Sequence, residues 1–316
     1  MKILITGSTG LIGAALAPLL SSRGNEVIRL VRPGSASDAD GVHWDPRSGT
    51  IDEAALEGLD GVVHLAGENI AAGRWTATQK QQIRDSRVRG TSLLSASLAR
   101  LARPPRVWVS ASAIGYYGNR GDEVLREESP PGSGFLPEVC IAWEAATKAA
   151  EDRGIRVVHL RTGMVLSMAG GALAKMLPIF RMGAGGVIGN GRQYMSWIDL
   201  DDVIGAIHHA LTTDCLRGPL NTVAPAPVTN REFTKALGRV LSRPTLFPLP
   251  AFAAQLALGE MANELLLASQ RVEPARLVAS GYQFRFPDLE GALRHLSEKA
   301  AGGERLSRTA HPPGTA

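Results

Sequence analysis

The sequence contains little cysteine and no long apolar run, and both absences exclude whole classes of protein. Only Cys140 and Cys215 occur among 316 residues, too few for the disulfide framework of a small secreted domain. No stretch approaches the about 18 uninterrupted apolar residues that a membrane-spanning helix needs, and the N-terminus does not resemble a signal peptide. We therefore expect a cytoplasmic protein with no membrane partner.

Charge of one sign is also scarce. The chain has 34 basic and 30 acidic residues, a net charge of +4, without the clustered Lys and Arg of a nucleic-acid footprint. The seven histidines are scattered without metal-ligand spacing, so we expect neither a nucleic-acid partner nor a metal. The hydrophobic content of 44% is enough to fill the core of an ordinary globular protein.

Short apolar, β-branched runs alternate with helix-periodic segments over the first two thirds of the chain. The runs predict buried strands at Lys2–Thr6, Val27–Val31, Gly61–Leu65, Arg106–Ser110 and Ile155–Leu160. The segments between them predict helices at Leu11–Arg23, Thr76–Ala102 and Glu138–Arg153. This alternation predicts an α/β protein with a doubly wound parallel sheet, the Rossmann architecture.

Beyond about Ser167 the pattern loosens, because glycine pairs interrupt it and predict loops. Later segments predict a helix at Leu200–Leu211, a last strand at Leu216–Val223, a helix at Asn230–Leu241, helical pieces within Phe252–Gln270 and a final helix ending near Leu296. We expect three parts: a Rossmann domain (1–166 with 197–228), a small, mostly helical C-terminal substrate lobe (167–196 with 229–297) and a flexible tail (298–316).

The first strand is followed by a glycine-rich turn that opens a helix. Gly7, Gly10 and Gly13 fall in Thr6-Gly7-Ser8-Thr9-Gly10-Leu11-Ile12-Gly13. Such glycines allow a tight turn, a close approach of a pyrophosphate and close packing of helix on strand, with the phosphates at the positive helix end. The turn predicts a dinucleotide site.

The end of the second predicted strand indicates which dinucleotide. An acidic residue there would bind the ribose 2′-OH of NAD, but the segment from Val27 to Pro33 contains none. Arg32 follows the strand and can pair with a 2′-phosphate. The alternative is that Arg29 and Arg32 are only surface charges. We expect NADP(H) as the cofactor.

Several segments together resemble the extended short-chain dehydrogenase/reductase superfamily. Besides the turn, they are Leu65-Ala66-Gly67, Gly67-Glu68-Asn69-Ile70, Ser110–Gly118, Trp143–Ala146, Arg161–Leu166, Gly170–Leu173, Ser196-Trp197-Ile198 and Ser269–Val272. The match is most similar to the sugar-nucleotide-epimerase-like subgroup called "epimerase family protein". The resemblance extends from residue 1 to about 297.

The resemblance implies roles by position. Thr9 to Ile12 would contact the pyrophosphate, Arg32 the 2′-phosphate, Leu65 and Ala66 the adenosine and ribose, and Val165 the nicotinamide. Gln82 and Arg87 fall where relatives also reach the cofactor. The implied cofactor set is Gly7, Thr9, Gly10, Leu11, Ile12, Gly13, Arg32, Leu65, Ala66, Gln82, Arg87 and Val165. Arg161, Gln193 and Trp197 sit where relatives line the substrate pocket, although Trp197 would also suit packing under a loop.

The chain departs from the superfamily at its catalytic residues. Ser112 matches the usual Ser, but Arg87 replaces the usual Asn, and Cys140 and Glu144 stand where Tyr and Lys of a Tyr-x-x-x-Lys pair belong. None of the four tyrosines has Lys at the fourth following position. A carboxylate one turn from a thiol raises the thiol pKa, whereas the usual Lys lowers that of Tyr. The standard proton relay is absent.

Three functions stay open from the sequence. The first is an NADP(H)-dependent oxidoreductase or epimerase on an unknown small-molecule substrate, with Ser112, Tyr116 and Arg87 as candidate catalytic residues. The second is a catalytically inactive NADP(H)-binding sensor or regulator, for example of cell division. The third is a nucleotide-sugar binding module. A homodimer through outer helices is also possible for such folds.

Overall fold

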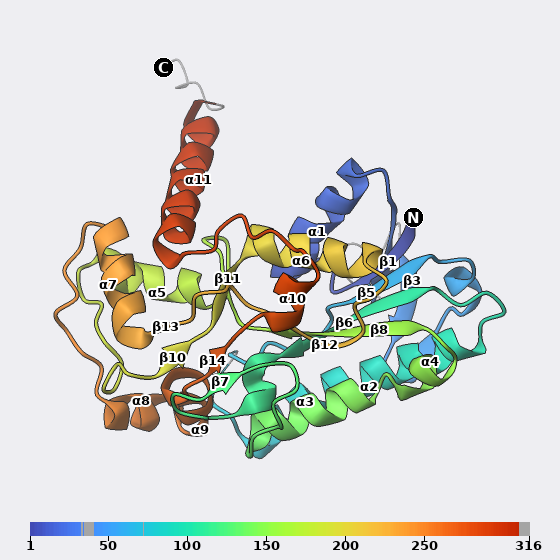
Figure 1. The fold of residues 1–316 in the computed structure, drawn as a ribbon, viewed down its shortest axis with the longest axis horizontal. Coiled ribbons are helices and arrows are strands. Elements are labelled where there is room, and N and C mark those ends of the chain that lie inside the picture. The colour runs from blue at the N-terminus through green and yellow to red at the C-terminus, as the bar shows by residue number, and fades with distance from the viewer. Residues whose placement is uncertain (33, 35–40, 72, 310–316) are drawn as a thin grey trace.

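The structure is built on one large parallel sheet. The computed structural model describes residues 1–32, 34, 41–71 and 73–309, and the sheet has eight strands in the order β12-β8-β6-β5-β1-β2-β3-β4 (Figure 1). They are β1 (Lys2–Thr6), β2 (Glu26–Val31), β3 (Val42–Asp45), β4 (Thr50–Ile51), β5 (Gly61–His64), β6 (Val107–Ala113), β8 (Arg156–Thr162) and β12 (Gly218–Thr222). All neighbours are parallel except β3 and β4. The predicted Rossmann class is confirmed.

Helices cover both faces of the sheet, as Figure 1 shows. α1 (Leu11–Ser22) and α6 (Leu200–Thr212) pack on one face, where side chains such as Leu16 and Ile207 join the strands in one core. α2 (Ala77–Arg100), α3 (Phe135–Ala145) and α4 (Lys148–Asp152) lie on the other side. Leu94 and Leu98 of α2 join the second core there. Burial of apolar side chains on both faces is the main stabilising term for such a sheet.

The C-terminal segments form a further group with a hydrophobic core of its own. α5 (Gly171–Arg181), α7 (Asn230–Val240) and α11 (Leu289–Thr309) contribute to it, with Trp197 at its centre. Shorter elements complete the region: β7 (Val124–Leu125), β9 (Met164–Leu166), β10 (Tyr194–Met195), β11 (Trp197–Asp199), β13 (Val228–Thr229), α8 (Ala251–Leu258), α9 (Glu260–Ala262), β14 (Arg271–Val272) and α10 (Ala275–Ala279). The predicted domain boundaries stay a prediction.

Three sequence-based expectations about elements were wrong. β3 was missed because four residues are too short a run to show alternation. The expected loops of 167–196 contain α5, which begins directly at Gly171. The single helix expected at Glu138–Arg153 is divided into α3 and α4. α11 extends to Thr309, residues 310–316 lie outside the described residues, and the flexible tail expected for 298–316 stays a prediction.

Within the described part of the chain, no helix is both long and apolar enough to cross a bilayer. Several of the helices bury apolar side chains in the cores described above. Strand β6 continues to Ala113, three residues beyond the predicted end. Ser112 therefore lies on the strand itself, at the carboxyl edge of the sheet.

Candidate functional site

The turn after β1 has no room for any side chain at two of its glycines. Gly7 has a φ of +67°, and a Cβ there would lie 2.8 Å from the carbonyl carbon of Leu65. A Cβ on Gly13 would lie 2.2 Å from the carbonyl oxygen of Gly7. Gly10 is less constrained, because its nearest neighbour would be 3.3 Å away. α1 begins directly after the turn, so its free N–H groups and positive dipole end face the space above it.

A cavity of about 220 Å³ lies between this turn and the ends of the central strands. Its lining comes from the turn and from β5, β6, β8, β9 and α6: Gly7, Gly10, Leu11, Ile12, Gly13, Leu65, Ala111, Ser112, Leu160, Thr162, Val165, Val203 and Ile207. Seven expected cofactor residues and the expected catalytic Ser112 are thus brought together. The cavity sits where the strand order reverses beside β1, the position at which such sheets bind dinucleotides.

The other expected cofactor residues lie outside this cavity. Thr9, Arg32 and Gln82 are exposed, and Ala66 is half-buried. Arg87 is also half-buried: its guanidinium donates to the carbonyl oxygens of Ile83 and Glu68 at 3.0 and 3.1 Å. The cofactor contacts expected for these residues remain predictions.

A neutral hydrogen-bond network lies beneath the turn. The Nδ1 atom of buried His64 is 2.7 Å from the Thr6 hydroxyl, and its Nε2 atom is 3.0 Å from the Thr91 hydroxyl. Thr6 Oγ1 also accepts from the backbone N–H groups of Leu65 and Ala66, both at 3.1 Å. Burial lowers the pKa of His64 to about 4, so the ring is neutral at pH 7. The network fixes the ends of β1 and β5 without using any charge.

At the opposite end of the cavity, the fixed groups are charged. The Ser112 hydroxyl donates to Glu144 Oε1 at 2.7 Å. The same carboxylate receives two hydrogen bonds from Arg161, both at 2.9 Å, in a bidentate pair. The side chain of Glu144 is 13% exposed and that of Arg161 only 4%. The hydroxyl that faces the cavity is therefore oriented by a buried ion pair.

Arg161 does not line this cavity, and its expected role as a substrate contact stays a prediction. Its guanidinium carbon lies 3.4 Å from the centre of the Tyr116 ring, and Nη1 donates to the Tyr117 hydroxyl at 3.1 Å. Burial alone would lower the pKa of Arg161, but the hydrogen bonds and charge of Glu144 overcome burial and raise it. Arg161 is thus a permanent internal cation. Tyr116 lies beneath this cation instead of facing the cavity.

Cys140, which stands at the position of the usual tyrosine, has an unreactive thiol. The thiol is buried on α3, 3.7 Å from the carbonyl oxygen of Ala113. Burial, followed by the charge of Glu144, raises the pKa of Cys140 to about 12, so the thiol keeps its proton at pH 7. Arg87 lies over the Trp143 ring at 5.1 Å and is a structural neighbour of this region. Burial lowers the pKa of Arg87.

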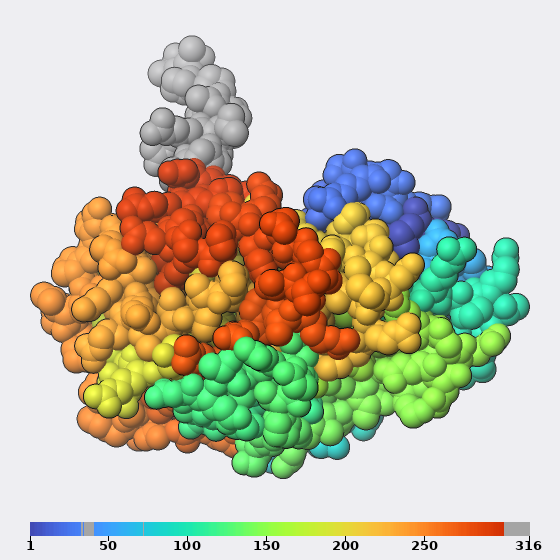
Figure 2. Space-filling model, viewed as in Figure 1, coloured from blue at the N-terminus to red at the C-terminus, as the bar shows by residue number. Residues whose placement is uncertain are grey.

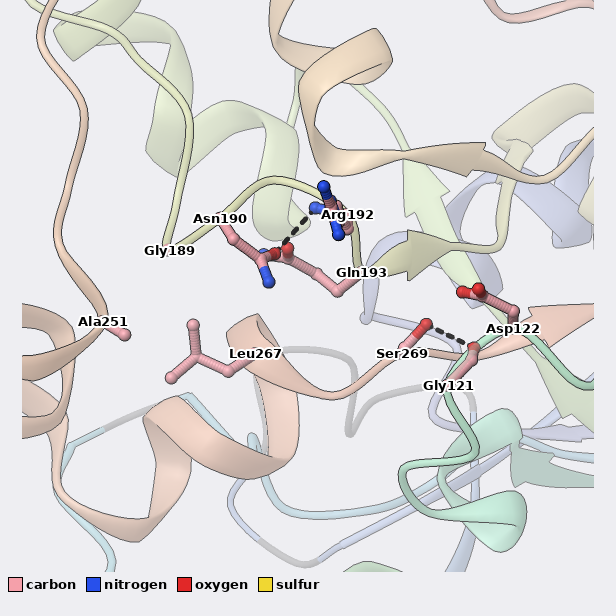
Figure 3. A pocket seen from close by; sticks show the side chains of 9 residues that line it. All are labelled: Gly121, Asp122, Gly189, Asn190, Arg192, Gln193, Ala251, Leu267 and Ser269. Carbon is pink, nitrogen blue, oxygen red and sulfur yellow. Dashed lines mark hydrogen bonds between the residues drawn. The ribbon is translucent and has the colours of Figure 1, made fainter.

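A second cavity, of about 320 Å³, opens between the C-terminal segments and the loop after β6 (Figure 3). Apolar Ala251 and Leu267 lie on one side and the polar loop of Asn190, Arg192 and Gln193 on the other. Gln193, an expected substrate residue, lines it and also donates to the carbonyl oxygens of Ile188 and Leu266. The cavity has the mixed polarity of a small-molecule site.

The expectation that Trp197 lines the substrate pocket was wrong. Its side chain is 0% exposed and belongs to the core formed by α5, α7 and α11. The indole N–H donates to the carbonyl oxygen of Ala226 at 3.0 Å. A buried tryptophan with a satisfied N–H stabilises the fold and has no free surface for a ligand.

The comparisons with known proteins fit this geometry. Residues 3–219 match the model of the NAD dependent epimerase/dehydratase family. The chain belongs to this family. Residues 249–296 match a second model, described only as a domain of unknown function, DUF1731. The resemblance inferred from the sequence motifs is confirmed.

Relatives of the family extend over nearly the whole chain. The epimerase family protein ML0860 of Mycobacterium leprae is 46% identical over 297 residues, which is 94% of this chain and 96% of that protein. The crystal structure of the human epimerase family protein SDR39U1 with NADPH has a TM-score of 0.86 at 38% identity, and the match covers 94% of this chain and 99% of that one. A nucleoside-diphosphate sugar epimerase of Corynebacterium glutamicum has a TM-score of 0.77 at 37% identity, covering 97% of this chain and 61% of that one.

Two parts of the site were missed by sequence reasoning. Glu144 was recognised as a replacement for Lys, but not as the acceptor of the Ser112 hydroxyl. The compensating signal was Arg161, a basic residue near the end of a predicted buried strand, where an unpaired charge would be costly. The His64 network gave no local signal, because its members come from β1, β5 and α2.

No three His, Cys, Asp or Glu residues are grouped to hold a metal ion within the described residues.

Proposed function

We propose that the protein binds NADP(H) in the cavity between the β1 turn and Ser112. The carrying observation is the close packing of the turn at Gly7 and Gly13, where any Cβ would collide with backbone. This packing holds the free N–H groups at the start of α1 beside the cavity, where they can bind a phosphate. The family match and the NADPH in the human relative support the same ligand. Arg32, exposed directly after β2, would hold the 2′-phosphate.

We further propose that the protein is an oxidoreductase or epimerase in which Ser112 handles the proton. When bound, NADP(H) would supply or accept the hydride. Because the Ser112 O–H donates to Glu144, the lone pairs of Ser112 Oγ are left to accept a proton from a substrate hydroxyl. A small-molecule substrate would have to reach Ser112 within the same cavity.

The proton balance follows from this geometry. In the oxidising direction, the substrate hydroxyl gives its proton to Ser112 Oγ, and the serine proton passes to the Glu144 carboxylate. The substrate carbon loses its hydride, and a C=O bond forms. The reverse sequence reduces a carbonyl, and an epimerase performs both in turn. Arg161 holds Glu144 in position throughout and is a positioning residue.

Cofactor preference is tested by titrating NADPH and NADH in parallel by fluorescence. NADPH should bind more tightly, and Arg32→Ala should weaken NADPH binding by about 10- to 100-fold while leaving NADH unchanged, because a charged hydrogen bond is lost only with the 2′-phosphate. Arg29→Ala, three residues earlier and also exposed, is the matched control. Equal binding of both nucleotides would remove the NADP(H) assignment.

Catalysis is tested by a substrate screen that follows NADPH consumption or NADP⁺ reduction. The panel should include UDP- and GDP-sugars and simple carbonyl compounds. Ser112→Ala should lower turnover by about 10²- to 10⁴-fold, the usual contribution of a positioned acid or base. Ser110→Ala is the control: its hydroxyl is buried on the same strand but has no partner among the described residues. Equal effects of the two substitutions would remove Ser112 from the mechanism.

A second function, an NADP(H)-binding sensor without turnover, is favoured by one observation. Cys140 keeps its proton at pH 7 because its pKa is raised to about 12, and no Lys is present at position 144. The usual Tyr and Lys of the relay therefore have no equivalent here. A sensor would bind NADPH with the same dependence on Arg32, yet consume none with any substrate, and would change its partner or conformation on binding.

A further inference from the structure

One face of the protein exposes an unusual number of apolar side chains. Seven of the eleven large hydrophobic residues exposed among the described residues come from two short segments, 179–182 and 246–256. We call these seven the apolar patch: Ile179, Met182, Leu246, Phe247, Leu249, Phe252 and Leu256. Contiguous apolar surface of this kind usually marks an interaction site in a monomeric protein.

The two segments run side by side. Arg243 Nε donates to the carbonyl oxygen of Arg181 at 2.8 Å. Farther along, the Leu249 N–H donates to Val187 O at 2.8 Å, and the Gly189 N–H donates to Leu249 O at 2.9 Å. α8 follows directly after Pro250. The orange C-terminal segments that include residues 230–256 form the left edge of the molecule in Figure 2.

α8 lacks the polar side of an ordinary surface helix. Its sequence, Ala-Phe-Ala-Ala-Gln-Leu-Ala-Leu, contains no charged residue. Phe252 is 71% exposed and Leu256, one turn later, is 78% exposed. Gln255 is the only polar side chain of α8 and is also exposed, so most of the surface that this helix presents is apolar. Ala254 is buried, so one side of α8 packs against the fold while Phe252 and Leu256 are exposed to solvent.

Basic residues are frequent in the two stretches that carry the apolar patch, and Asp199, Glu232 and Glu260 lie directly beside these stretches. Residues 164–198 and 233–259 contain Lys175, Arg181, Arg192, Lys235, Arg239 and Arg243, and no Asp or Glu. These two stretches carry six positive charges, whereas the whole chain has a net charge of +4, so the remainder is net negative. Within the described part of the chain, only Arg239 of the six has a carboxylate partner, Glu290 at 2.7 Å.

We propose that the apolar patch docks on an anionic phospholipid surface. Phe and Leu side chains insert into the headgroup region while Lys and Arg attract the lipid phosphates. A second copy of the chain fits less well, because a symmetric contact would bring two basic faces together. This proposal replaces the sequence-based expectation of no membrane partner, which rested on the lack of a spanning segment. Ala251, the first residue of α8, also lines the second cavity, so docking would bring that cavity to the lipid.

The test is flotation of the full chain with vesicles of equal parts phosphatidylglycerol and phosphatidylcholine, or of phosphatidylcholine alone. The protein should float with the anionic vesicles and much less with the neutral ones. Phe252→Asp/Leu256→Asp should abolish flotation. Arg181→Glu should reduce the bound fraction by about fivefold or more, since each basic residue near such a surface contributes appreciably.

Val278→Asp is the matched control, because Val278 is 53% exposed on α10, outside the patch. It should float like the parent, and all variants should keep the parent's thermal midpoint because the replaced side chains are exposed. Failure to float with anionic vesicles, or equal loss in Val278→Asp, overturns the proposal. A dimer mass by light scattering that Phe252→Asp/Leu256→Asp converts to a monomer would assign the patch to a second copy and overturn it as well.

Discussion

The two ends of the cofactor cavity are held by opposite kinds of interaction. At the nucleotide end, Thr6, His64 and Thr91 form a buried network without charge. At the chemical end, a buried carboxylate and guanidinium, Glu144 and Arg161, fix the Ser112 hydroxyl. The polar groups at both ends are almost completely buried. The two ends differ in whether these groups are paired by neutral hydrogen bonds or by an ion pair.

This difference explains how the site tolerates the loss of the usual Lys. Replacing a cation by Glu144 inverts the charge beside Ser112, and an unpaired carboxylate there would be strongly disfavoured. Arg161, on the neighbouring strand β8, restores neutrality as a bidentate pair. The nucleotide end needed no such exchange, because its glycines and neutral hydrogen bonds bind a phosphate through backbone geometry. Removal of one charge should therefore destabilise the chemical end. The nucleotide end should instead be destabilised by added side-chain volume and by low pH.

The largest expected effect is on the ion pair. Arg161→Met should lower the free energy of unfolding by about 3–5 kcal/mol, because it leaves Glu144 buried without its partner. Chemical denaturation at pH 7 measures this. Arg161→Met/Glu144→Gln should recover part of the loss, since no uncompensated charge remains.

Arg239→Met is the matched control for that substitution. Arg239 also pairs with a carboxylate, at 2.7 Å, but its side chain is 59% exposed. An exposed pair contributes about 0–1 kcal/mol, so this change should cost little. Similar losses for Arg161→Met and Arg239→Met would show that the chemical end does not depend on a buried pair.

The sequence allowed the nucleotide end to be predicted far better than the chemical end. The turn from Gly7 to Gly13 is local, so its glycine spacing and its place after a strand carry nearly all the information. Ser112 and Glu144 are 32 residues apart, and only the packing of α3 against β6 shows that they touch. Trp197 illustrates the same limit, because an aromatic residue near a predicted loop can face a ligand or the core, and burial decides.

The next effect is a pH dependence of the protein's stability, which is expected from His64 at the nucleotide end. The pKa of His64 falls from 6.5 when unfolded to about 4 in the fold. Such a histidine stabilises the fold fully above pH 6.5, and this contribution is lost as the pH falls from 6.5 through 4. The loss amounts to about 3 kcal/mol. His64→Asn keeps an acceptor for Thr6 but cannot titrate, so the difference between the parent and variant stability profiles should show this slope.

The difference between profiles is needed because another group opposes His64. Burial raises the pKa of Asp199 to about 6; a carboxyl group with a raised pKa favours the fold as the pH falls through 6, which is the opposite sign. The parent's own profile is therefore flattened between about pH 4 and 6. Parallel profiles for the parent and His64→Asn would mean that His64 is not a buried neutral group.

The smallest change in stability, but a specific one, is expected at the turn. A Cβ on Gly13 would lie 2.2 Å from Gly7 O, so Gly13→Ala must move backbone atoms and should cost about 1–3 kcal/mol. The displaced turn should also lose most of its NADPH binding in the fluorescence titration. Gly10→Ala introduces the same methyl group 3.3 Å from its nearest neighbour, so it should cost clearly less in both measurements. Gly10→Ala and Gly13→Ala could instead weaken NADPH binding equally and leave stability unchanged. In that case the added methyl group contacts the ligand directly, and the close packing of α1 on the turn does not determine the shape of the nucleotide end.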